Sequence, residues 1–155
     1  MQDPPIWQRL AAALVYLLPW SDALEFGRSL FALFPPLQWA AVPAIPLLQL
    51  QQAVPFGGLV LFLVLFLAVV RNTNVPYLVR FHALQAILLD IVLVLLGLAF
   101  GILLAPLGPN FAVRTLQNTV FLGALLLVLF SVVQSLRGKE ADIPTVSEAV
   151  RMQLF

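Results

Sequence analysis

Long stretches without a charged or histidine side chain divide this sequence, and they constrain its fold more than any other feature. The longest covers residues 29–70, two more cover 91–113 and 115–136, and a shorter one covers 10–21. A helix needs about 20 mostly apolar residues to cross a bilayer, and the stretches at 91–113 and 115–136 meet that length. The sequence therefore predicts an all-α integral membrane protein, with one domain over residues 1–155.

The composition excludes the other broad classes of chain. Hydrophobic residues make up 62% of the sequence, charged residues make up 10%, and the net charge is +1. Soluble domains carry about 25% charged residues, disordered chains combine low hydrophobicity with high charge, and nucleic-acid binders are strongly basic. The sequence has no cysteine, which excludes disulfides, thiolate metal sites and cysteine nucleophiles.

Prolines and polar residues mark the ends of the predicted membrane crossings, of which we expect four. Pro55 suits a first helical turn and Arg71 suits a helix end, so one span is predicted at 54–71. The next is predicted at 76–105, about 45 Å long at about 1.5 Å per residue, so its first turns must protrude or tilt. The last is predicted at 112–137, before Gly138.

The N-terminal third is interrupted more often. Asp22 and Glu25 fit a capping box, so residues 6–34 are predicted to form a kinked helix pair that inserts obliquely. The alternative is a short span followed by an interfacial amphipathic helix. Prolines at 35, 36, 43 and 46 oppose a regular helix. Since irregular backbone cannot face lipid, this segment must lie at the interface, pack on protein or line a cavity, and Trp39 favours the interface.

The basic residues indicate an orientation. With four crossings, one side holds six of them (Arg9, Arg71, Arg80, Arg137, Lys139 and Arg151) and the other holds Arg28 and Arg114. The positive-inside rule then places both termini in the cytoplasm. Residues 138–155 form a predicted cytoplasmic tail. Apolar residues recur there every four positions, at Val146, Val150 and Leu154, which is typical of a helix that lies on the membrane.

Polar side chains near or within the third predicted span, Arg80, His82, Gln85 and Asp90, are the main functional candidates, because polar groups inside a membrane are rare and functional by default. The last three share a helix face about 140° wide at about 100° per residue. His82 alone is more typical of an interfacial anchor than of a switch. Asp90 lies deeper and needs a partner, water or a proton.

The last span offers the partners. If it packs antiparallel to the third, Gln134 falls near the depth of Gln85 and Ser131 near that of Asp90, which predicts contact between Asp90 and Ser131. These residues form either a water-lined, channel-like patch or an interhelical polar clamp. Gly97 and Gly101 form a G-x-x-x-G motif, which we assign to helix packing.

Sequence motifs for enzymes are absent. There is no G-x-S-x-G, H-E-x-x-H or P-loop sequence, and one histidine cannot build a His-rich metal site. We therefore predict neither an enzyme nor a cofactor or metal. Arg9 stands alone near the N-terminus, and no A-x-A-like site follows the first apolar segment, so no removable targeting segment is expected.

Residues 70–90, VRNTNVPYLVRFHALQAILLD, resemble the signature region of the Tic-twenty family. This family is the multispanning channel-type subunit of the chloroplast inner-envelope protein translocon, TIC. The shared features are a polar loop, Pro76, the tripeptide at 80–82 and the acidic Asp90. The A-x-x-Y-L-L-P pattern at 13–19 and the G-K-x-x-x-x-P pattern at 138–144, with Glu148 beyond it, also match.

The resemblance implies four helices with both termini on the stromal or cytoplasmic side. It implies a subunit that moves or inserts proteins, with other translocon subunits as partners and precursor proteins as cargo, in a cyanobacterial or plastid-encoded member. The membrane is then the plasma membrane, the thylakoid or the inner envelope. A polypeptide-wide pore would need oligomers or partners. Two alternatives stay open: a structural or assembly subunit, and a small-solute channel or transporter, which predicts charges deep in several helices.

Overall fold

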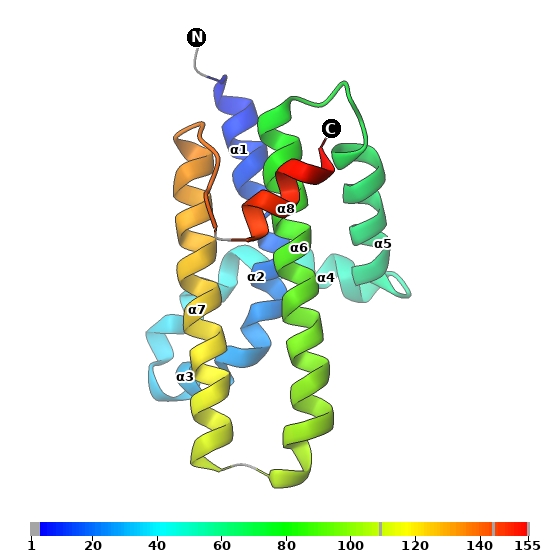
Figure 1. Cartoon of the computed structure of the whole chain (residues 1–155). Coiled ribbons are helices and arrows are strands. Elements are labelled where there is room, and N and C mark those ends of the chain that lie inside the picture. Colours follow the sequence, from blue (N-terminus) through cyan, green and yellow to red (C-terminus); the bar gives the residue numbers. More distant parts are fainter. Residues whose placement is uncertain (1–3, 109, 144, 155) are drawn as a thin grey trace.

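The computed structural model describes residues 4–108, 110–143 and 145–154, and within these ranges every regular element is a helix. Pro144 of the G-K-x-x-x-x-P pattern lies outside the described residues. Helices α6 (Tyr77–Ala99) and α7 (Phe111–Leu136) run the length of the molecule as a hairpin (Figure 1). With its extensions η4 (Phe100–Leu104) and η5 (Ala105–Leu107), α6 is 31 residues long, and both helices are apolar enough to cross a membrane.

The turn of the hairpin is stabilised by two of its own residues, Gly108 and Asn110. Gly108 has a φ of +69°, a conformation that glycine adopts without strain. The Asn110 side chain then accepts a hydrogen bond of 2.9 Å from the backbone N–H of Val113, which caps the start of α7.

The N-terminal element (residues 6–33) lies between the two long helices. It consists of α1 (Ile6–Leu14), α2 (Leu17–Ala23), the 3₁₀ turn η1 (Leu24–Gly27) and α3 (Arg28–Leu33). Both α1 and α2 contact α6 and α7, whereas α6 and α7 scarcely touch each other. Asp22 lies inside α2 rather than at a helix start, so the predicted capping box is wrong. The helix continues through Glu25 as η1 and turns only afterwards.

The Pro-rich stretch forms short helical pieces that pack on protein. Residues Pro35–Ala44 form a 3₁₀ helix, η2, and α4 (Ile45–Ala53) begins with Pro46 in its first turn, where its missing N–H costs nothing. The prediction of irregular backbone over 35–46 is therefore wrong. The indole N–H of Trp20 donates a 2.8 Å hydrogen bond to the carbonyl of Ala40, which fixes η2 on α2. Trp39 stays exposed.

The predicted span at 54–71 forms the second arm of a bent pair of helices. Helix α5 (Gly57–Val64) continues as a π-helical turn, η3 (Leu65–Val70), and the pair Pro35–Ala53 and Gly57–Val70 meets at 108°. Pro55 and the left-handed Phe56 (φ 55°) form the bend. The structure thus holds two straight candidate spans and one broken or re-entrant pair, and four complete crossings stay a prediction.

The C-terminal segment (residues 138–154) folds back onto the bundle. Its helix α8 (Val146–Gln153) packs on α6. Val150 is fully buried and Leu154 nearly so, in a cluster with Phe81 and Ala83 of α6. The prediction that this helix lies on the membrane is therefore wrong, because the apolar face of α8 is covered by protein.

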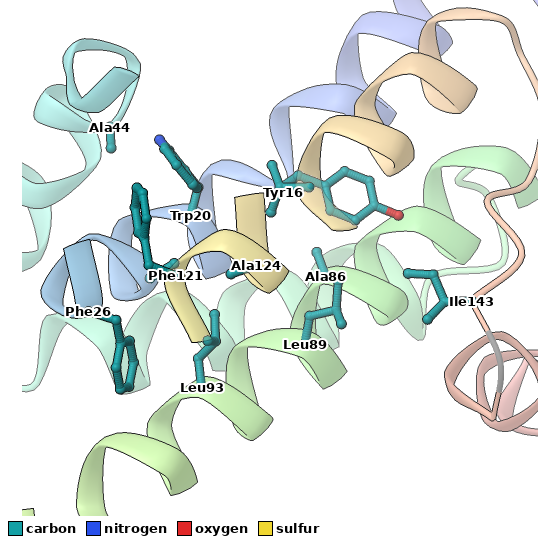
Figure 2. Close-up of a cluster of buried hydrophobic side chains, with 12 residues drawn as sticks. Tyr16, Trp20, Phe26, Ala44, Ala86, Leu89, Leu93, Phe121, Ala124 and Ile143 are labelled. Atoms are coloured by element: carbon teal, nitrogen blue, oxygen red, sulfur yellow. The ribbon is translucent and has the colours of Figure 1, made fainter. Parts of the chain in front are cut away.

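The main core joins the N-terminal element to both long helices (Figure 2). The Phe121 ring lies 5.6 Å from that of Trp20 and 5.4 Å from that of Phe31, and Phe26 meets Phe100 edge-on at 5.4 Å. Such aromatic pairs contribute about 0.5–1.5 kcal/mol each beyond area burial. They hold the N-terminal element in place from α2 to α3.

Replacing Gly57 with alanine should destabilise the protein, because a Cβ there would lie 2.1 Å from the backbone oxygen of Gln51. The bend must then shift, and a strained backbone costs about 1–3 kcal/mol. Gly58→Ala is the matched control, since a Cβ at Gly58 meets nothing within 4 Å. Thermal unfolding in detergent compares the two variants, and equal melting temperatures would contradict this account of the bend.

Candidate functional site

A buried polar cluster lies where the N-terminal helix breaks, between Leu14 and Leu17. The Tyr16 hydroxyl is 2.7 Å from His82 Nδ1 and 3.1 Å from Gln85 Nε2, and all three side chains are buried. Tyr16 comes from the N-terminal element, and the other two come from adjacent turns of α6. We call Tyr16, His82 and Gln85 the polar cluster.

The hydrogens of this cluster follow from its partners. His82 Nε2 is 2.9 Å from the carbonyl oxygen of Lys139, which can only accept, so Nε2 carries the proton. In the neutral ring Nδ1 is then an acceptor, and the Tyr16 hydroxyl donates to it. The Tyr16 oxygen in turn accepts from Gln85 Nε2. Each member thus fixes the orientation of the next.

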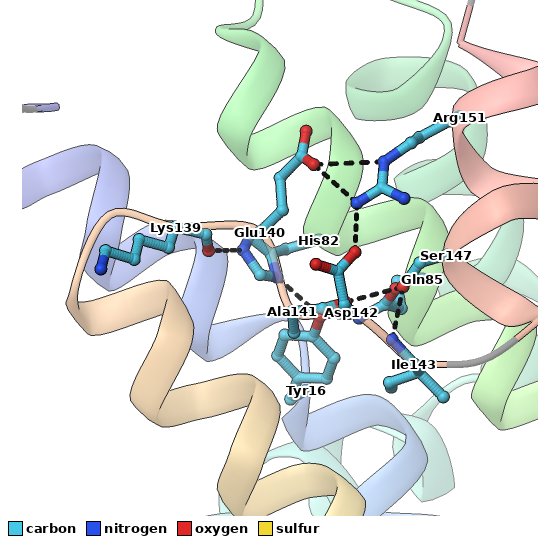
Figure 3. A network of polar contacts seen from close by, with 10 residues as sticks. All are labelled: Tyr16, His82, Gln85, Lys139, Glu140, Ala141, Asp142, Ile143, Ser147 and Arg151. Carbon is cyan, nitrogen blue, oxygen red and sulfur yellow. Dashed lines mark hydrogen bonds and ion pairs between the residues drawn. The ribbon is translucent and has the colours of Figure 1, made fainter.

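The C-terminal segment completes the hydrogen bonding of Gln85 (Figure 3). Gln85 Nε2 donates to the carbonyl of Ala141 at 3.1 Å, and the Ser147 hydroxyl lies 2.7 Å from Gln85 Oε1. Ser147 Oγ also accepts from the backbone N–H of Ile143 at 2.8 Å. Both hydrogens of the Gln85 amide therefore have acceptors inside the bundle, the Tyr16 oxygen and the Ala141 carbonyl.

Ion pairs within the C-terminal segment join residues 140 and 142 to α8 on the outer side. Arg151 of α8 donates to Glu140 at 2.8 Å and also to Asp142. Its guanidinium lies 5.5 Å from the centre of the Phe81 ring of α6. Hydrogen bonds to Asp142 and Glu140 raise the pKa of Arg151 above its ordinary value, so this charge is present at any physiological pH.

The predicted contact between Asp90 and Ser131 does not form. The Ser131 side chain is fully buried and faces the Tyr16 phenol, and its hydroxyl has no well-aligned hydrogen bond within the described residues. Asp90 lies instead beside Asp22 of α2, and one of its oxygens likewise has no partner in the described part of the chain. The prediction failed because α1 and α2 occupy the space between α6 and α7.

Two other candidates lie away from the polar cluster. Arg80 Nε donates to the carbonyl of Val70 at 3.0 Å, so it fixes the end of η3 beside the loop into α6. The Gln134 side-chain oxygen is buried, with no hydrogen bond to any described residue. Gln85, which was expected at a similar depth, bonds instead to Tyr16 and Ala141.

Gly97 and Gly101 face a cavity rather than a neighbouring helix. A Cβ on Gly101 would meet nothing within 4 Å, and one on Gly97 would meet only the Phe26 ring at 3.9 Å. The assignment of this motif to close helix packing is therefore wrong within the chain. The cavity has a volume of about 480 Å³, and its polar lining consists of Glu25, Ser29, Arg114 and Gln117.

Sequence reasoning missed Tyr16, Ala141 and Ser147 as members of the site. Tyr16 carried a usable signal, because a tyrosine inside an apolar helix needs a partner for its hydroxyl. Ala141 carried none, since it contributes a backbone carbonyl. Among the described residues no group of three or more His, Asp and Glu side chains could hold a metal ion.

Comparison with known proteins decides the family. A sequence model described as "Chloroplast import apparatus Tic20-like" matches residues 1–150. The chain belongs to the Tic20 family. The resemblance of residues 70–90 to this family is thereby confirmed.

Relatives in the Tic20 family come from cyanobacteria and chloroplasts. The chain is 44% identical over 147 residues to a Tic20 family protein of Synechocystis sp., covering 94% of this chain and 92% of that protein. It is 37% identical over 153 residues to "Protein TIC 20-II, chloroplastic" of Arabidopsis thaliana, covering 97% and 74%. It is 31% identical over 161 residues to "Tic20 family protein Ycf60" of Gracilaria tenuistipitata var. liui, covering 99% and 78%.

Replacing Tyr16 with phenylalanine should destabilise the bundle by about 1–3 kcal/mol, because it leaves His82 Nδ1 and one Gln85 amide hydrogen buried without a partner. Denaturant-induced unfolding in detergent measures the change. Tyr77→Phe is the control, since Tyr77 is 46% exposed and its hydroxyl meets the partly exposed Glu140, so its loss should cost less than the loss of the buried Tyr16 hydroxyl. A Tyr16→Phe protein as stable as the control would show that the cluster contributes little.

Proposed function

We propose that this chain is a membrane subunit of a protein translocation or insertion machinery. Membership of a family described as chloroplast import apparatus supports this role. The structural observation that carries it is the series of polar groups on the N-terminal element and its neighbours. The polar cluster lies at one end, Asp22 and Asp90 lie deeper, and the cavity with Glu25 and Arg114 follows. Polar groups at membrane depth mark transport pathways.

This series is interrupted by apolar side chains. Trp20, Phe26 and Phe121 are buried in the core along the same N-terminal element. A passage wide enough for a polypeptide therefore requires these rings to move, or requires walls supplied by other subunits or further copies of the chain. We accordingly expect other translocon subunits as partners and precursor proteins as cargo.

The arrangement of the ends supports the proposed orientation. In Figure 1 the start of α1, the end of α8 and the loop between η3 and α6 lie toward the same end of the long hairpin. That end carries the six basic residues of the sequence count, and Arg28 and Arg114 belong to the other set. Under the positive-inside rule the termini then face the cytoplasm or stroma.

One observation favours the alternative of a structural or assembly subunit. The hydrogen bonds of the polar cluster close on the chain's own backbone, as expected of a clamp that only stabilises the bundle. Such bonds contribute about 0.6–2 kcal/mol each in membranes. The two roles differ in whether a precursor in transit meets the interior of the subunit.

A single cysteine at Gly101 tests the proposed role, because the chain has no other cysteine and this position opens into the cavity. With a precursor arrested in native membranes, a thiol crosslinker should join Gly101→Cys to the precursor, since reaction needs a hydrated thiolate. Leu103→Cys is the control, because Leu103 is 68% exposed on the outer surface. Crosslinks from Gly101→Cys to resident membrane proteins alone would favour assembly.

A further inference from the structure

We propose that the groove between the N-terminal element, α6 and α7 is a binding site for extended polypeptide backbone, and that residues 139–143 of the same chain occupy it as an internal ligand. A client segment takes their place when the C-terminal segment leaves. This inference rests on the proposed function, because it names how such a subunit holds its client.

The groove contacts its occupant through main-chain atoms. His82 and Gln85 donate to the carbonyls of Lys139 and Ala141, at 2.9 and 3.1 Å. These carbonyls belong to alternate residues, and an extended chain presents alternate groups on one side. The donors lie three residues apart on α6 and are neighbours on its surface. Neither hydrogen bond depends on the identity of the bound side chains.

The side chains of the occupant are selected mainly at one position. The methyl group of Ala141 is fully buried, so the groove accepts a small residue there, whereas Glu140 and Asp142 point outward to Arg151. Main-chain recognition of an extended segment is how several protein classes bind peptides of varied sequence. A translocation subunit has a similar requirement, since its clients share a backbone and need only present a small residue at the position of Ala141.

The C-terminal segment can leave as one unit. Its ion pairs join Arg151 to Glu140 and Asp142 within the segment itself, so they need not break when the segment leaves. The segment joins α7 through Gly138, whose φ of +74° marks a sharp turn. Besides the hydrogen bonds to α6, the contact of Arg151 with the Phe81 ring and the apolar burial of Ile143 and Val150 attach it to the bundle.

An empty groove would be unfavourable in an apolar bundle. Departure of the segment leaves His82 Nε2 and one Gln85 hydrogen without acceptors, and Gln85 Oε1 without its donor Ser147, and a buried unpaired polar group is costly. The carbonyls of a second extended chain restore the first two bonds, and a backbone N–H of that chain can donate to Gln85 Oε1. The groove is therefore prepared for polypeptide as soon as its own segment is displaced.

The first experiment displaces the segment. In Ala141→Phe the ring cannot fit the buried position of Ala141. Ala149→Phe is the control, because Ala149 lies on the exposed face of α8. The probe is Ala86→Cys, because Ala86 is fully buried in the same apolar cluster as Ile143 (Figure 2). A membrane-impermeant maleimide should label this cysteine at least about tenfold faster with Ala141→Phe, since labelling requires local opening. Ala149→Phe should leave the rate unchanged.

One control excludes general unfolding, and a second variant displaces the segment by another route. A cysteine at Ala124, a core position of α7 in the same cluster, should stay protected in every variant. Glu140→Lys with Asp142→Lys replaces the ion pairs that hold residues 139–143 against α8 with repulsion from Arg151, without altering a buried side chain, and it should also accelerate labelling of Ala86→Cys. This double variant serves if Ala141→Phe does not fold. Unchanged labelling in both would overturn the proposal, because the segment would then not be a removable occupant.

The second experiment supplies a ligand to the displaced protein. A short synthetic peptide of small apolar residues should slow labelling of Ala86→Cys, and a scrambled version should slow it equally. A reduced-amide analogue, which lacks alternate carbonyls, should not protect. Displacement without protection by either peptide would overturn the binding site and leave the segment a structural seal. Equal protection by the analogue would also overturn it, since carbonyl recognition would then be absent.

These results are separable from a failure of the proposed function. The labelling assays use the isolated protein and need no translocation, whereas the Gly101→Cys crosslink needs a precursor in transit. Peptide protection without a precursor crosslink would keep the binding site and remove the translocation role. A precursor crosslink without peptide protection would do the reverse.

Discussion

The hydrogen bond between Tyr16 and His82 is the interaction on which the rest of this structure depends. Polar groups in an apolar bundle must find partners inside the protein, and the Tyr16 hydroxyl does so where the N-terminal helix breaks. This bond fixes the N-terminal element against α6, and contacts to α7 separate the two long helices. The C-terminal segment then finds room to fold back, and its Lys139 carbonyl meets the far side of the same His82 ring.

His82 consequently couples two ends of the chain. In the neutral ring one nitrogen donates and the other accepts, so the Lys139 carbonyl at Nε2 fixes Nδ1 as the acceptor for Tyr16. Loss of the carbonyl frees the ring to change its tautomer, which removes the acceptor from the Tyr16 hydroxyl. The position of the C-terminal segment and the anchoring of the N-terminal element are therefore linked through one side chain. A bare packing contact would give no such directional link.

The predictable and unpredictable parts of the molecule differ in how they are encoded. The long helices could be read from the sequence, because uncharged runs and the turn near Gly108 bound them. His82, Gln85 and Asp90 were expected on one face, and all three are buried. Their partners could not be read, since Ala141 offers only a backbone carbonyl and Asp22 was assigned to a cap. Periodicity reports which face is buried and carries no information on which segment covers it.

The same reasoning locates where the molecule must move in order to open. The long helices make few direct contacts, so the N-terminal element determines whether the space between them is filled. It is held at one end by hydrogen bonds to α6 and at the other by aromatic packing, where Gly27 lies so close to Phe121 that a Cβ would approach the ring to 2.7 Å. The break before Leu17 and the 3₁₀ turn η1 separate these anchors. The two anchors therefore oppose opening in different ways: displacement at the aromatic end exposes the buried rings of Trp20, Phe26 and Phe121, and displacement at the polar end requires new partners for His82 and Gln85.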